Sequence, residues 1–419
     1  MGNSILKFGI WGFILIFSSN TNFLKAQIKG CNDTKAINYN SLATSNDGSC
    51  TYNSASESPV NSTELAAVMN ETSGLIQWNG KVWTHNDDTD TNIYSFDPTN
   101  PTAYTAYKLN GVVNTEWEDM AQDNDYIYLG DFGNNANGNR TNLRILKISK
   151  SSMLQNNPTV ETIQFSYQTQ TNFAATGANK SDFDCEALIV SDDSIFLFTK
   201  EWISKKTSLF ALPKTAGNHI AKYMGSYNVE GLITGATYLK NKNLIALCGY
   251  TESLQPFVVL LYDFKKNNFL AANKRKISLN LLYHQVEGIS TLDGENYFIS
   301  NEKITQSYFT VPPKIHTLNL SAYLADYLRA YTHIETVKNY FSGIKVAPNP
   351  AHETLKIDVP NSLNSQVRIY NTSGQLAGAF STCNGTLHLS VENLCCGLYS
   401  YVIDMPSFHS YSGKFLVQK

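Results

Sequence analysis

Residues 73–87, SGLIQWNGKVWTHND, decide the fold, because their pattern returns four more times along the chain. The stretch opens on a polar residue, Ser73, and runs through a short apolar strand, a turn and a second strand that ends in polar residues. Short apolar strands separated by turns are typical of antiparallel sheets. The four later copies begin at Glu118, Glu186, Thr234 and Glu287.

The spacing of these copies predicts a β-propeller over residues 57–335. Groups of strands that return every 45–70 residues are the signature of this all-β fold. Five copies predict a five-bladed propeller, with six blades as the alternative if one copy is degenerate. An open β-sandwich does not explain five matching openings. The fifth copy lacks an outer strand, and residues 64–69 are expected to supply it and close the ring.

The composition is that of an exported β protein. The 419 residues carry 32 basic and 35 acidic side chains, a net charge of −3, which argues against nucleic acid as a partner. Charged residues make up 16% and aromatic residues 12% of the chain, whereas disorder needs high charge with few aromatics. Chains rich in Tyr and Phe tend to form sheets with half-buried faces. The length allows two or three domains.

The first 26 residues read as an export signal. Lys7 precedes an apolar run, residues 8–17, and a small residue, Ala26, follows it, as in a secretory signal peptide. The run is too short for a membrane span, which needs roughly 20 apolar residues. No longer apolar stretch follows, so the mature chain is expected to have no transmembrane segment.

The next segment, residues 27–53, is expected to be a small module closed by one disulfide. In an oxidising compartment its two cysteines, Cys31 and Cys50, most simply bond to each other. The segment resembles a short module of secreted Bacteroidetes proteins in which Gly-Cys-x-Asp, Ala-x-Asn-Tyr and Asp-Gly-Ser-Cys recur. Its acidic and amide oxygens suit Ca²⁺, although a closed turn without metal is the simpler interpretation.

The last part of the chain forms a separate unit. Residues 341–419 alternate with period two between turns, which predicts a small β-sandwich. Pro-Asn-Pro at 348–350, Ile-Tyr-Asn-x-x-Gly at 369–374, Leu-x-x-Gly-x-Tyr-x-Tyr at 394–401 and Gly-Lys-Phe at 413–415 follow in order. This unit resembles the C-terminal sorting domain of the type IX secretion system of Bacteroidetes. The resemblance implies export across the outer membrane by the type IX machinery, then anchoring at the cell surface or release.

The repeat places a set of polar residues at one mouth of the central channel. In a propeller blade the first strand lies innermost, and its start lies beside the end of the antiparallel second strand. The five leading residues are therefore expected to ring the mouth: Ser73, Glu118, Glu186, Thr234 and Glu287. The polar residues near the ends of the second strands should surround this ring: His85, Asp87, Asp131, Asn134, Lys200, Tyr250, Asn301 and Glu302.

Three glutamates in one ring predict an axial Ca²⁺. Glu118, Glu186 and Glu287 repel one another unless one is protonated or a cation lies between them. Carboxylate and hydroxyl oxygens are hard ligands that suit Ca²⁺, so these three with Ser73 and Thr234 are the expected ligands. The alternative is a water-filled channel whose glutamates bond to backbone amides.

The order Ser, Glu, Glu, hydroxyl, Glu on successive inner strands resembles the calcium-activated nucleotidases, or apyrases. Residues 73–83, Glu118 before Tyr-Leu-Gly at 128–130, and Val-Glu-Gly-Ile at 286–289 carry this resemblance. It implies a five-bladed propeller with an axial Ca²⁺. The family follows its first hairpin with Asp-Arg-Thr-Gly, whereas this chain has Asp-Asp-Thr-Asp at 87–90. A phosphate site without that Arg lacks a bidentate donor.

Two functions follow from these residues. The first is a phosphate-ester or anhydride hydrolase in which Ca²⁺ organises a small phosphorylated substrate. Asp87 or Asp131 would act on the water, and Lys200 and Arg140 would offer positive charge to the phosphate oxygens. The remaining rim residues would contact the substrate: His85, Asn134, Tyr250, Asn301 and Glu302. The second is a non-catalytic surface protein whose aromatic-rimmed face binds a glycan or another protein.

Overall fold

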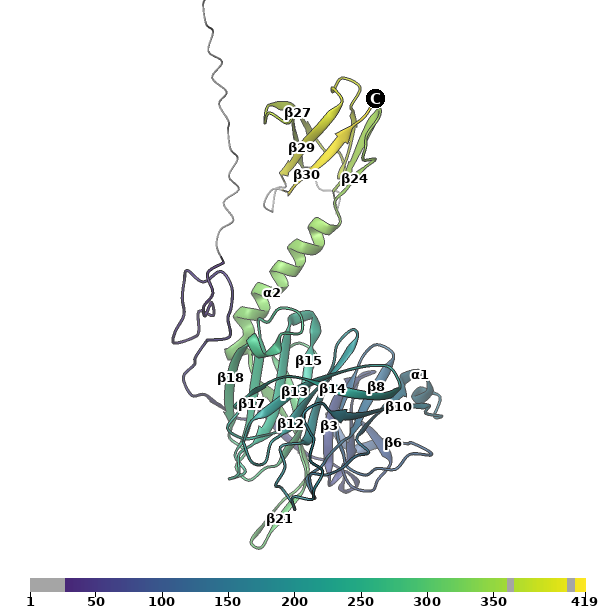
Figure 1. Cartoon of the computed structure of the whole chain (residues 1–419), viewed down its shortest axis with the longest axis vertical. Helices are drawn as coiled ribbons and strands as arrows, with labels where there is room; N and C mark the ends of the chain where they lie inside the picture. Colours follow the sequence, from purple (N-terminus) through teal and green to yellow (C-terminus); the bar gives the residue numbers. More distant parts are fainter. Residues whose placement is uncertain (1–26, 360–364, 405–410) are drawn as a thin grey trace, which may run out of the picture.

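The structure is a computed structural model that describes residues 27–359, 365–404 and 411–419, with only the backbone of residues 332–342. The expected signal peptide, residues 1–26, lies outside the described part. As predicted, the described chain is almost entirely β-structure. It forms a propeller and a smaller C-terminal unit, joined by a helix (Figure 1).

The propeller strands group into four-stranded blades in chain order. The first blade consists of β3 (Thr72–Trp78), β4 (Lys81–Asn86), β5 (Asn92–Asp97) and β6 (Asn100–Lys108). The second consists of β7 (Trp117–Gln122), β8 (Tyr126–Asp131), β9 (Arg144–Ser149) and β10 (Val160–Tyr167), with the short helix α1 (Lys150–Leu154) before β10. The third consists of β11 (Asp184–Val190), β12 (Ser194–Lys200), β13 (Thr207–Pro213) and β14 (Gly217–Tyr227).

The fourth and fifth blades each include a strand from the N-terminal part of the chain. The fourth consists of β15 (Leu232–Leu239), β16 (Leu244–Tyr250), β17 (Pro256–Tyr262) and β18 (Asn273–Leu279), with β1 (Ser56–Glu57) parallel to β18. The fifth consists of β19 (Val286–Thr291), β20 (Asn296–Asn301), β23 (Lys314–Asn319) and β2 (Asn61–Glu64). A hairpin of β21 (Ile304–Gln306) and β22 (Phe309–Val311) projects between β20 and β23.

The first strands of the blades form a closed ring around the channel. Strand β3 contacts β7, and the contacts continue through β11 and β15 to β19, which contacts β3 again. At the outer edge, β10 and β14 pair in parallel and join the second and third blades into one sheet. The described strands thus make a closed β-propeller, which confirms the predicted all-β fold class.

The ring is closed by the N-terminal strand β2 (Asn61–Glu64), which ends where the expected strand at 64–69 was to begin. Its residues pair with β23, so the N-terminal part does supply the missing outer strand. The predicted strand at 64–69 is wrong for residues 65–69, which include the 3-10 turn η1 (Ala67–Met69). Leu65 and Met69, on either side of the start of this turn, are both buried in the core beside the first blade.

Burial on both faces explains the apolar runs of the inner strands. Every residue of β16 and of β17 is buried, because neighbouring blades pack against both faces of the sheet. Such strands read as continuous apolar sequences rather than as an alternating pattern. The outer strand β6 is mostly exposed, in keeping with its polar sequence. The core therefore consists of layers between adjacent blades.

The helix α2 (Ser321–Ser342) leads from the propeller to the C-terminal unit. Leu324 and Leu328, near its start, are buried against the fourth and fifth blades. The C-terminal unit contains the predicted sandwich, with a sheet of β24 (Lys345–Ala347), β25 (Thr354–Asp358) and β28 (Thr386–Ser390). The other sheet contains β27 (Leu376–Ser381), β26 (Gln366–Tyr370), β29 (Gly397–Asp404) and β30 (Tyr411–Val417).

The N-terminal module lies against the fourth blade. The predicted disulfide between Cys31 and Cys50 is present. Asp33 accepts a hydrogen bond from the Tyr262 hydroxyl of β17 at 2.5 Å, and Asn46 bonds to Asn273 of β18 at 2.8 Å. The module is thus docked by an Asp33 carboxylate oxygen and by the Asn46 side-chain nitrogen.

Candidate functional site

The site begins with a bulge that recurs at the opening of every inner strand. In the third, fourth and fifth blades, the residue that the bulge leaves without a cross-strand partner is Glu186, Thr234 and Glu287 respectively. In the second blade Glu118 and Asp119 fall in the bulge. A β-bulge turns a side chain away from its regular direction and is common beside active sites. Four of the five predicted ring residues therefore leave the strand pairing at equivalent positions.

Glycines make this arrangement possible, because the inner strands approach one another closely. In the first blade Gly74 lies in the bulge, directly after Ser73. A Cβ on Gly74 would come within 2.5 Å of the backbone nitrogen of Met120 on β7, and one on Gly235 within 2.4 Å of the backbone oxygen of Glu287 on β19. A larger residue at either position would push two blades apart.

One cavity of about 210 Å³ brings seven of the predicted site residues together. These seven are Asp87, Glu118, Glu186, Lys200, Tyr250, Glu287 and Glu302. Four further lining residues were not predicted: Asn135, Asn179, Trp202 and Gln285. The cavity lies at the mouth where the inner strands start, because Asp184, at the start of β11, pairs with Lys200, at the end of β12.

The two hydroxyl residues of the ring link neighbouring blades. The Ser73 hydroxyl donates to the backbone oxygen of Glu118 on β7. The Thr234 hydroxyl donates to the backbone oxygen of Val286 on β19 at 2.5 Å. Each hydroxyl oxygen keeps lone pairs that can accept a further bond or a cation.

The ring carboxyl groups are buried, and the charges of Glu118 and Glu287 both raise the pKa of Glu186. Burial, and then nearby carboxylates, raise the pKa values of Glu118 and Glu186 well above the usual range. Glu118 is the acidic neighbour that raises the pKa of Glu186 most, and two ionised carboxylates placed side by side repel each other. Burial raises the pKa of Glu287 to about 7, and its Oε2 is buried without a hydrogen-bond partner among the described residues. These groups need either protons or a cation.

Lys200 is the one basic side chain among the residues described as lining the cavity. Its Nζ lies 3.3 Å from Glu186 Oε1, and the rings of Trp202 and Tyr250 lie 4.9 and 5.4 Å from it. Burial opposes its charge, but Glu186 and other acidic neighbours outweigh burial and hold the pKa of Lys200 well above its usual value. Lys200 is therefore a fixed positive charge in an acidic cavity.

Asp131, Arg140 and Asn134 lie outside the cavity lining and bind one another or nearby loops. Asp131 is fully buried and pairs with Arg140 and Arg144, each at 2.8 Å. Arg140 also donates to the backbone oxygen of Gly133 at 2.7 Å. Asn134 accepts from the Arg140 backbone N–H at 3.0 Å. The structure thus places this trio in the support of a loop.

His85 and Asn301 are buried beneath the same mouth. The Nδ1 of His85 lies 3.1 Å from the backbone oxygen of Asn86, and its ring meets Trp117 edge-on at 5.9 Å. Burial lowers the pKa of His85 to about 4, so the ring is neutral at physiological pH. Asn301 accepts from Nε2 of His316 at 2.8 Å. Neither of these two residues is among those that line the cavity.

Three acidic residues near the channel escaped the sequence analysis. Asp119 bonds to backbone amides of the neighbouring inner strands. Asp184 accepts from the Trp202 indole at 2.7 Å. Glu71 lies beside Asp87 and Glu302, and one carboxylate oxygen from each of these three lies within 4.8 Å of the others. Each missed residue stands within two positions of a predicted ring residue, which is the signal that would have found it.

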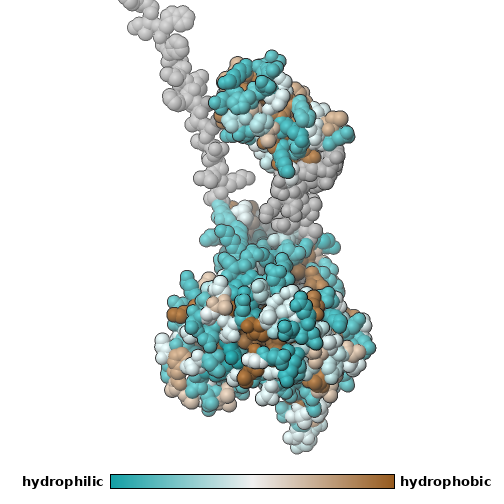
Figure 2. Space-filling model, turned by 90° about the vertical axis from the view of Figure 1, so that its right-hand side faces the viewer, coloured by the Kyte–Doolittle hydropathy of each residue, from teal (hydrophilic) through white to brown (hydrophobic). Residues whose placement is uncertain are grey.

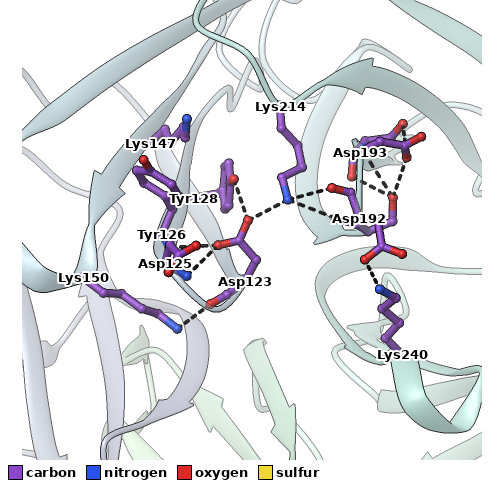
Figure 3. Close-up of polar contacts among 12 residues, drawn as sticks. Asp123, Asp125, Tyr126, Tyr128, Lys147, Lys150, Asp192, Asp193, Lys214 and Lys240 are labelled. Atoms are coloured by element: carbon purple, nitrogen blue, oxygen red, sulfur yellow. Dashed lines mark hydrogen bonds and ion pairs between the residues drawn. The ribbon is translucent and has the colours of Figure 1, made fainter.

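A second polar cavity, of about 660 Å³, lies at the opposite mouth, among the turns that follow the inner strands. Figure 3 shows Lys214 reaching Asp123, a contact of 2.6 Å, and Lys150 reaching the backbone oxygen of Asp123, also at 2.6 Å. Burial lowers the pKa of Lys150 to about 8. Trp78 and Tyr238 add aromatic surface to this cavity.

The comparisons with known proteins identify the C-terminal unit. Residues 345–418 match the family model described as the secretion system C-terminal sorting domain. The unit is a type IX sorting domain. A protein with this sorting domain engages the type IX secretion machinery and is secreted or attached to the outer surface of the cell. The matched residues lie within the range 341–419 that was expected from the sequence.

No helix among the described residues is long and apolar enough to cross a membrane. Figure 2 shows a mainly hydrophilic face with several separate apolar patches on the propeller, one of them near the centre of the view. Exposed apolar side chains are scattered among different blades, as Tyr104 of the first blade and Ile220 of the third are. Scattered apolar side chains need no special explanation.

The propeller itself has only weak likenesses. No curated protein matches the chain. PorZ of Porphyromonas gingivalis, an essential surface component of the type IX secretion system, is 14% identical over 84% of this chain, with a TM-score of 0.29. The chain spans 46% of PorZ, about half its length. A putative 6-phosphogluconolactonase from Bacteroides uniformis is 12% identical over 75% of this chain and 87% of its own, with a TM-score of 0.32. Sequence identities and TM-scores this low support no conclusion about the function of this chain.

Proposed function

We propose that the protein is a secreted, calcium-dependent hydrolase of phosphate esters or anhydrides, acting at the carboxylate cavity of the propeller. The observation that carries the proposal is the convergence of Asp87, Lys200 and the three ring glutamates on one cavity. The resemblance of the inner strands to the apyrases supports the same reading. Export by the sorting domain would bring the cavity to substrates outside the cell.

The ring offers hard oxygen atoms that suit Ca²⁺, although Glu118, Glu186 and Glu287 are not among the described carboxylates whose oxygens all lie within 4.8 Å of one another. Glu118, Glu186 and Glu287 would hold the ion together with the hydroxyls of Ser73 and Thr234, all hard oxygen ligands. The buried Glu287 Oε2 makes no hydrogen bond with a described residue, and a buried carboxylate oxygen without a partner is costly. When bound, Ca²⁺ would supply positive charge that polarises a phosphoryl oxygen.

The chain's own residues supply the rest of the chemistry. Lys200 would hold a phosphate oxygen, because its ammonium group is the one cation in the lining and is fixed by Glu186. Asp87 would orient the attacking water and accept its proton. Asp131 and Arg140 neutralise each other and therefore have no part in this chemistry.

Phosphate release from a panel of nucleotides and sugar phosphates, with Ca²⁺ and with a chelator, tests the proposal. Asp87→Asn should lower turnover by roughly 100-fold or more, which is what a positioned proton acceptor contributes. Asp88→Asn is the matched control, since Asp88 is the exposed neighbour in the same turn. If no compound of the panel yields phosphate, or both variants behave alike, the hydrolase proposal is wrong.

The cavity at the opposite mouth favours a second candidate, the binding of a glycan. Aromatic faces such as Trp78 and Tyr238 beside paired Asp and Lys side chains suit a sugar, which offers apolar faces and hydroxyls. Screening the protein on a glycan array tests this function. Trp78→Leu should abolish binding, whereas Trp202→Leu, in the other mouth, should leave it unchanged. The absence of any bound glycan would rule it out.

A further inference from the structure

Glu71, Asp87 and Glu302 form a separate acidic group at the edge of the cavity. Their ligand oxygens all lie within 4.8 Å of one another. Glu71 stands just before β3, Asp87 just after β4 and Glu302 just after β20. The group therefore spans the junction between the first and fifth blades, where the propeller ring closes.

The backbone and a glutamine hold these side chains in place. The Asp87 N–H donates to the backbone oxygen of Glu71 at 3.1 Å, and the Glu302 N–H donates to that of Gln285 at 3.2 Å. The Gln285 side chain donates to Glu302 Oε1 at 2.5 Å. One carboxylate oxygen of Glu71 and one of Glu302 lie within 4.8 Å of each other. Two ionised carboxyl groups this close repel each other unless a cation lies between them.

An unpartnered buried oxygen points to a ligand at the same place. Glu287 is 6% exposed, and its Oε2 has no hydrogen-bond partner among the described residues. Glu287 lines the cavity together with Asp87 and Glu302. Among the charged groups nearby, Glu287 raises the pKa values of Asp87 and Glu302 the most. A buried polar atom of this kind calls for an ion or a water as its partner.

Charge balance argues for more than one cation. With Glu71, the cavity has six carboxyl groups, and Lys200 is the one ammonium in its lining. The positive charge of Lys303, which is exposed, opposes the rise that burial causes in the pKa of Glu71. If every group is ionised, one divalent cation in the ring leaves the lining strongly negative. Hard carboxylate oxygens favour Ca²⁺ over softer metals.

We propose that Glu71, Asp87 and Glu302 bind a second Ca²⁺, distinct from the one assigned to the ring glutamates. Glu287 lines the same cavity as Asp87 and Glu302. The second ion bridges the first and fifth blades, and its remaining coordination sites open to the cavity. This inference does not require the proposed hydrolysis, because cation binding is measurable without a substrate.

Calcium titration of the full mature chain, after chelator treatment, tests the inference by calorimetry. The wild type should bind two ions in the cavity. Glu71→Gln and Glu302→Gln should each weaken the binding of one ion by at least about tenfold. Replacing a residue that only hydrogen-bonds to a metal ligand already lowers metal affinity by roughly 10- to 100-fold. Glu116→Gln is the matched control. The charge of Glu116 raises the pKa of Asp87, but Glu116 lies outside the three-carboxylate group. Two variants protect the test against a failure of one to fold, which circular dichroism would reveal.

A second readout separates this inference from the ring site. Tb³⁺ replaces Ca²⁺ and luminesces when an aromatic residue such as Trp202, in the cavity wall, transfers energy to it. Loss of one ion in Glu71→Gln, with the other lost in Glu186→Gln, supports both sites. If Glu71→Gln and Glu302→Gln bind Ca²⁺ as Glu116→Gln does, the inference is overturned, whatever Glu186→Gln shows. If only Glu186→Gln keeps wild-type binding, the second site stands and the ring site fails.

Discussion

The carboxylate of Asp119, on β7, accepts the backbone N–H of Leu188, on β11, at 2.9 Å. The same oxygen accepts the N–H of Ala236, on β15, at 3.2 Å, and the other oxygen accepts that of Met120. One side chain with no exposed surface therefore ties three inner strands together beneath the acidic cavity. The bulge that frees Glu118 from the strand pairing also frees Asp119, so the functional and the structural carboxylate come from one irregularity.

Replacing Asp119 by Ala should destabilise the propeller more than an ordinary surface change. The variant leaves backbone N–H groups buried without partners, each at a cost of about 1–3 kcal/mol. We expect a loss of about 2–4 kcal/mol in the free energy of unfolding, measured by urea denaturation. Asp125→Ala, at an exposed position in the turn after the same strand, is the control. Equal midpoints for the two variants would contradict the bridging role.

Acid should weaken the closure of the ring through His316. This residue of β23 bonds to Ser62 of β2 at 2.7 Å and to Asn301 of β20 at 2.8 Å. Burial lowers its pKa from 6.5 to about 3, so the unfolded chain takes up the proton first. The stabilisation is complete above pH 6.5 and is lost as the pH falls towards 3, at up to about 1.4 kcal/mol per unit.

Urea denaturation between pH 7 and pH 4 measures this dependence. His316→Gln keeps hydrogen-bonding groups but cannot titrate, so its stability should fall less steeply with pH than that of the wild type. The comparison must be between the two chains, because the buried carboxyl groups, whose pKa values are raised, act with the opposite sign. Parallel pH profiles would show that His316 does not titrate as proposed.

The sequence repeat predicted the positions of the site residues well and their partners poorly. A repeat of hairpins tells which strand ends meet at one mouth, and seven residues chosen in this way do line one cavity. It does not tell what each side chain bonds to. Asp131 and Arg140 stand near suitable strand ends but pair with each other. The spacing of residues along the chain does not show that the loop after β8 folds back and brings these two side chains together.

The bulges were also hidden in the sequence, although glycines mark some of them. Gly74 and Gly235 lie where inner strands nearly touch, and a glycine within an apolar strand often signals a bulge or a close approach. Read in this way, the same strands would have predicted that the residues beside these glycines leave the pairing. The strand β2 was misplaced for a different reason. Its polar sequence suits an exposed outer edge, whereas the apolar residues after it were taken for the strand.

Opening the disulfide should release the N-terminal module without unfolding the propeller. The bond joins residues 19 positions apart, and closing such a loop contributes roughly 3 kcal/mol in the chain-entropy model. In a variant with Cys31→Ser and Cys50→Ser, trypsin should cleave after Lys35 much faster than in the wild type. Limited proteolysis followed by mass spectrometry measures this. Equal cleavage rates would mean that docking through Tyr262 alone holds the module.

Removal of the sorting domain should stop export but leave the propeller folded. A chain that ends after Ser342 retains Leu324 and Leu328, which pack into the propeller core, and independent cores fold without their neighbours. In the native host the shortened protein should collect in the periplasm. Cell fractionation with thermal melting of the purified protein checks both statements. Surface display of the shortened chain would contradict the role of the sorting domain.

Calcium should stabilise the propeller through its ring of glutamates. A ligand that binds only the folded state stabilises it by about 2.7 kcal/mol at one hundred times its dissociation constant. A chelator should therefore lower the melting temperature, and Glu186→Gln should reduce that response, because the variant keeps the shape but removes a charged ligand. The alternative, a water-filled channel without metal, predicts the reverse: glutamine would relieve repulsion between Glu118 and Glu186 and raise the melting temperature. The N-terminal module offers oxygens of its own, so the comparison belongs in a chain that begins near Glu57. Identical melting of that chain with chelator and with Ca²⁺ would exclude the metal from the ring and leave protons to balance the buried carboxyl groups.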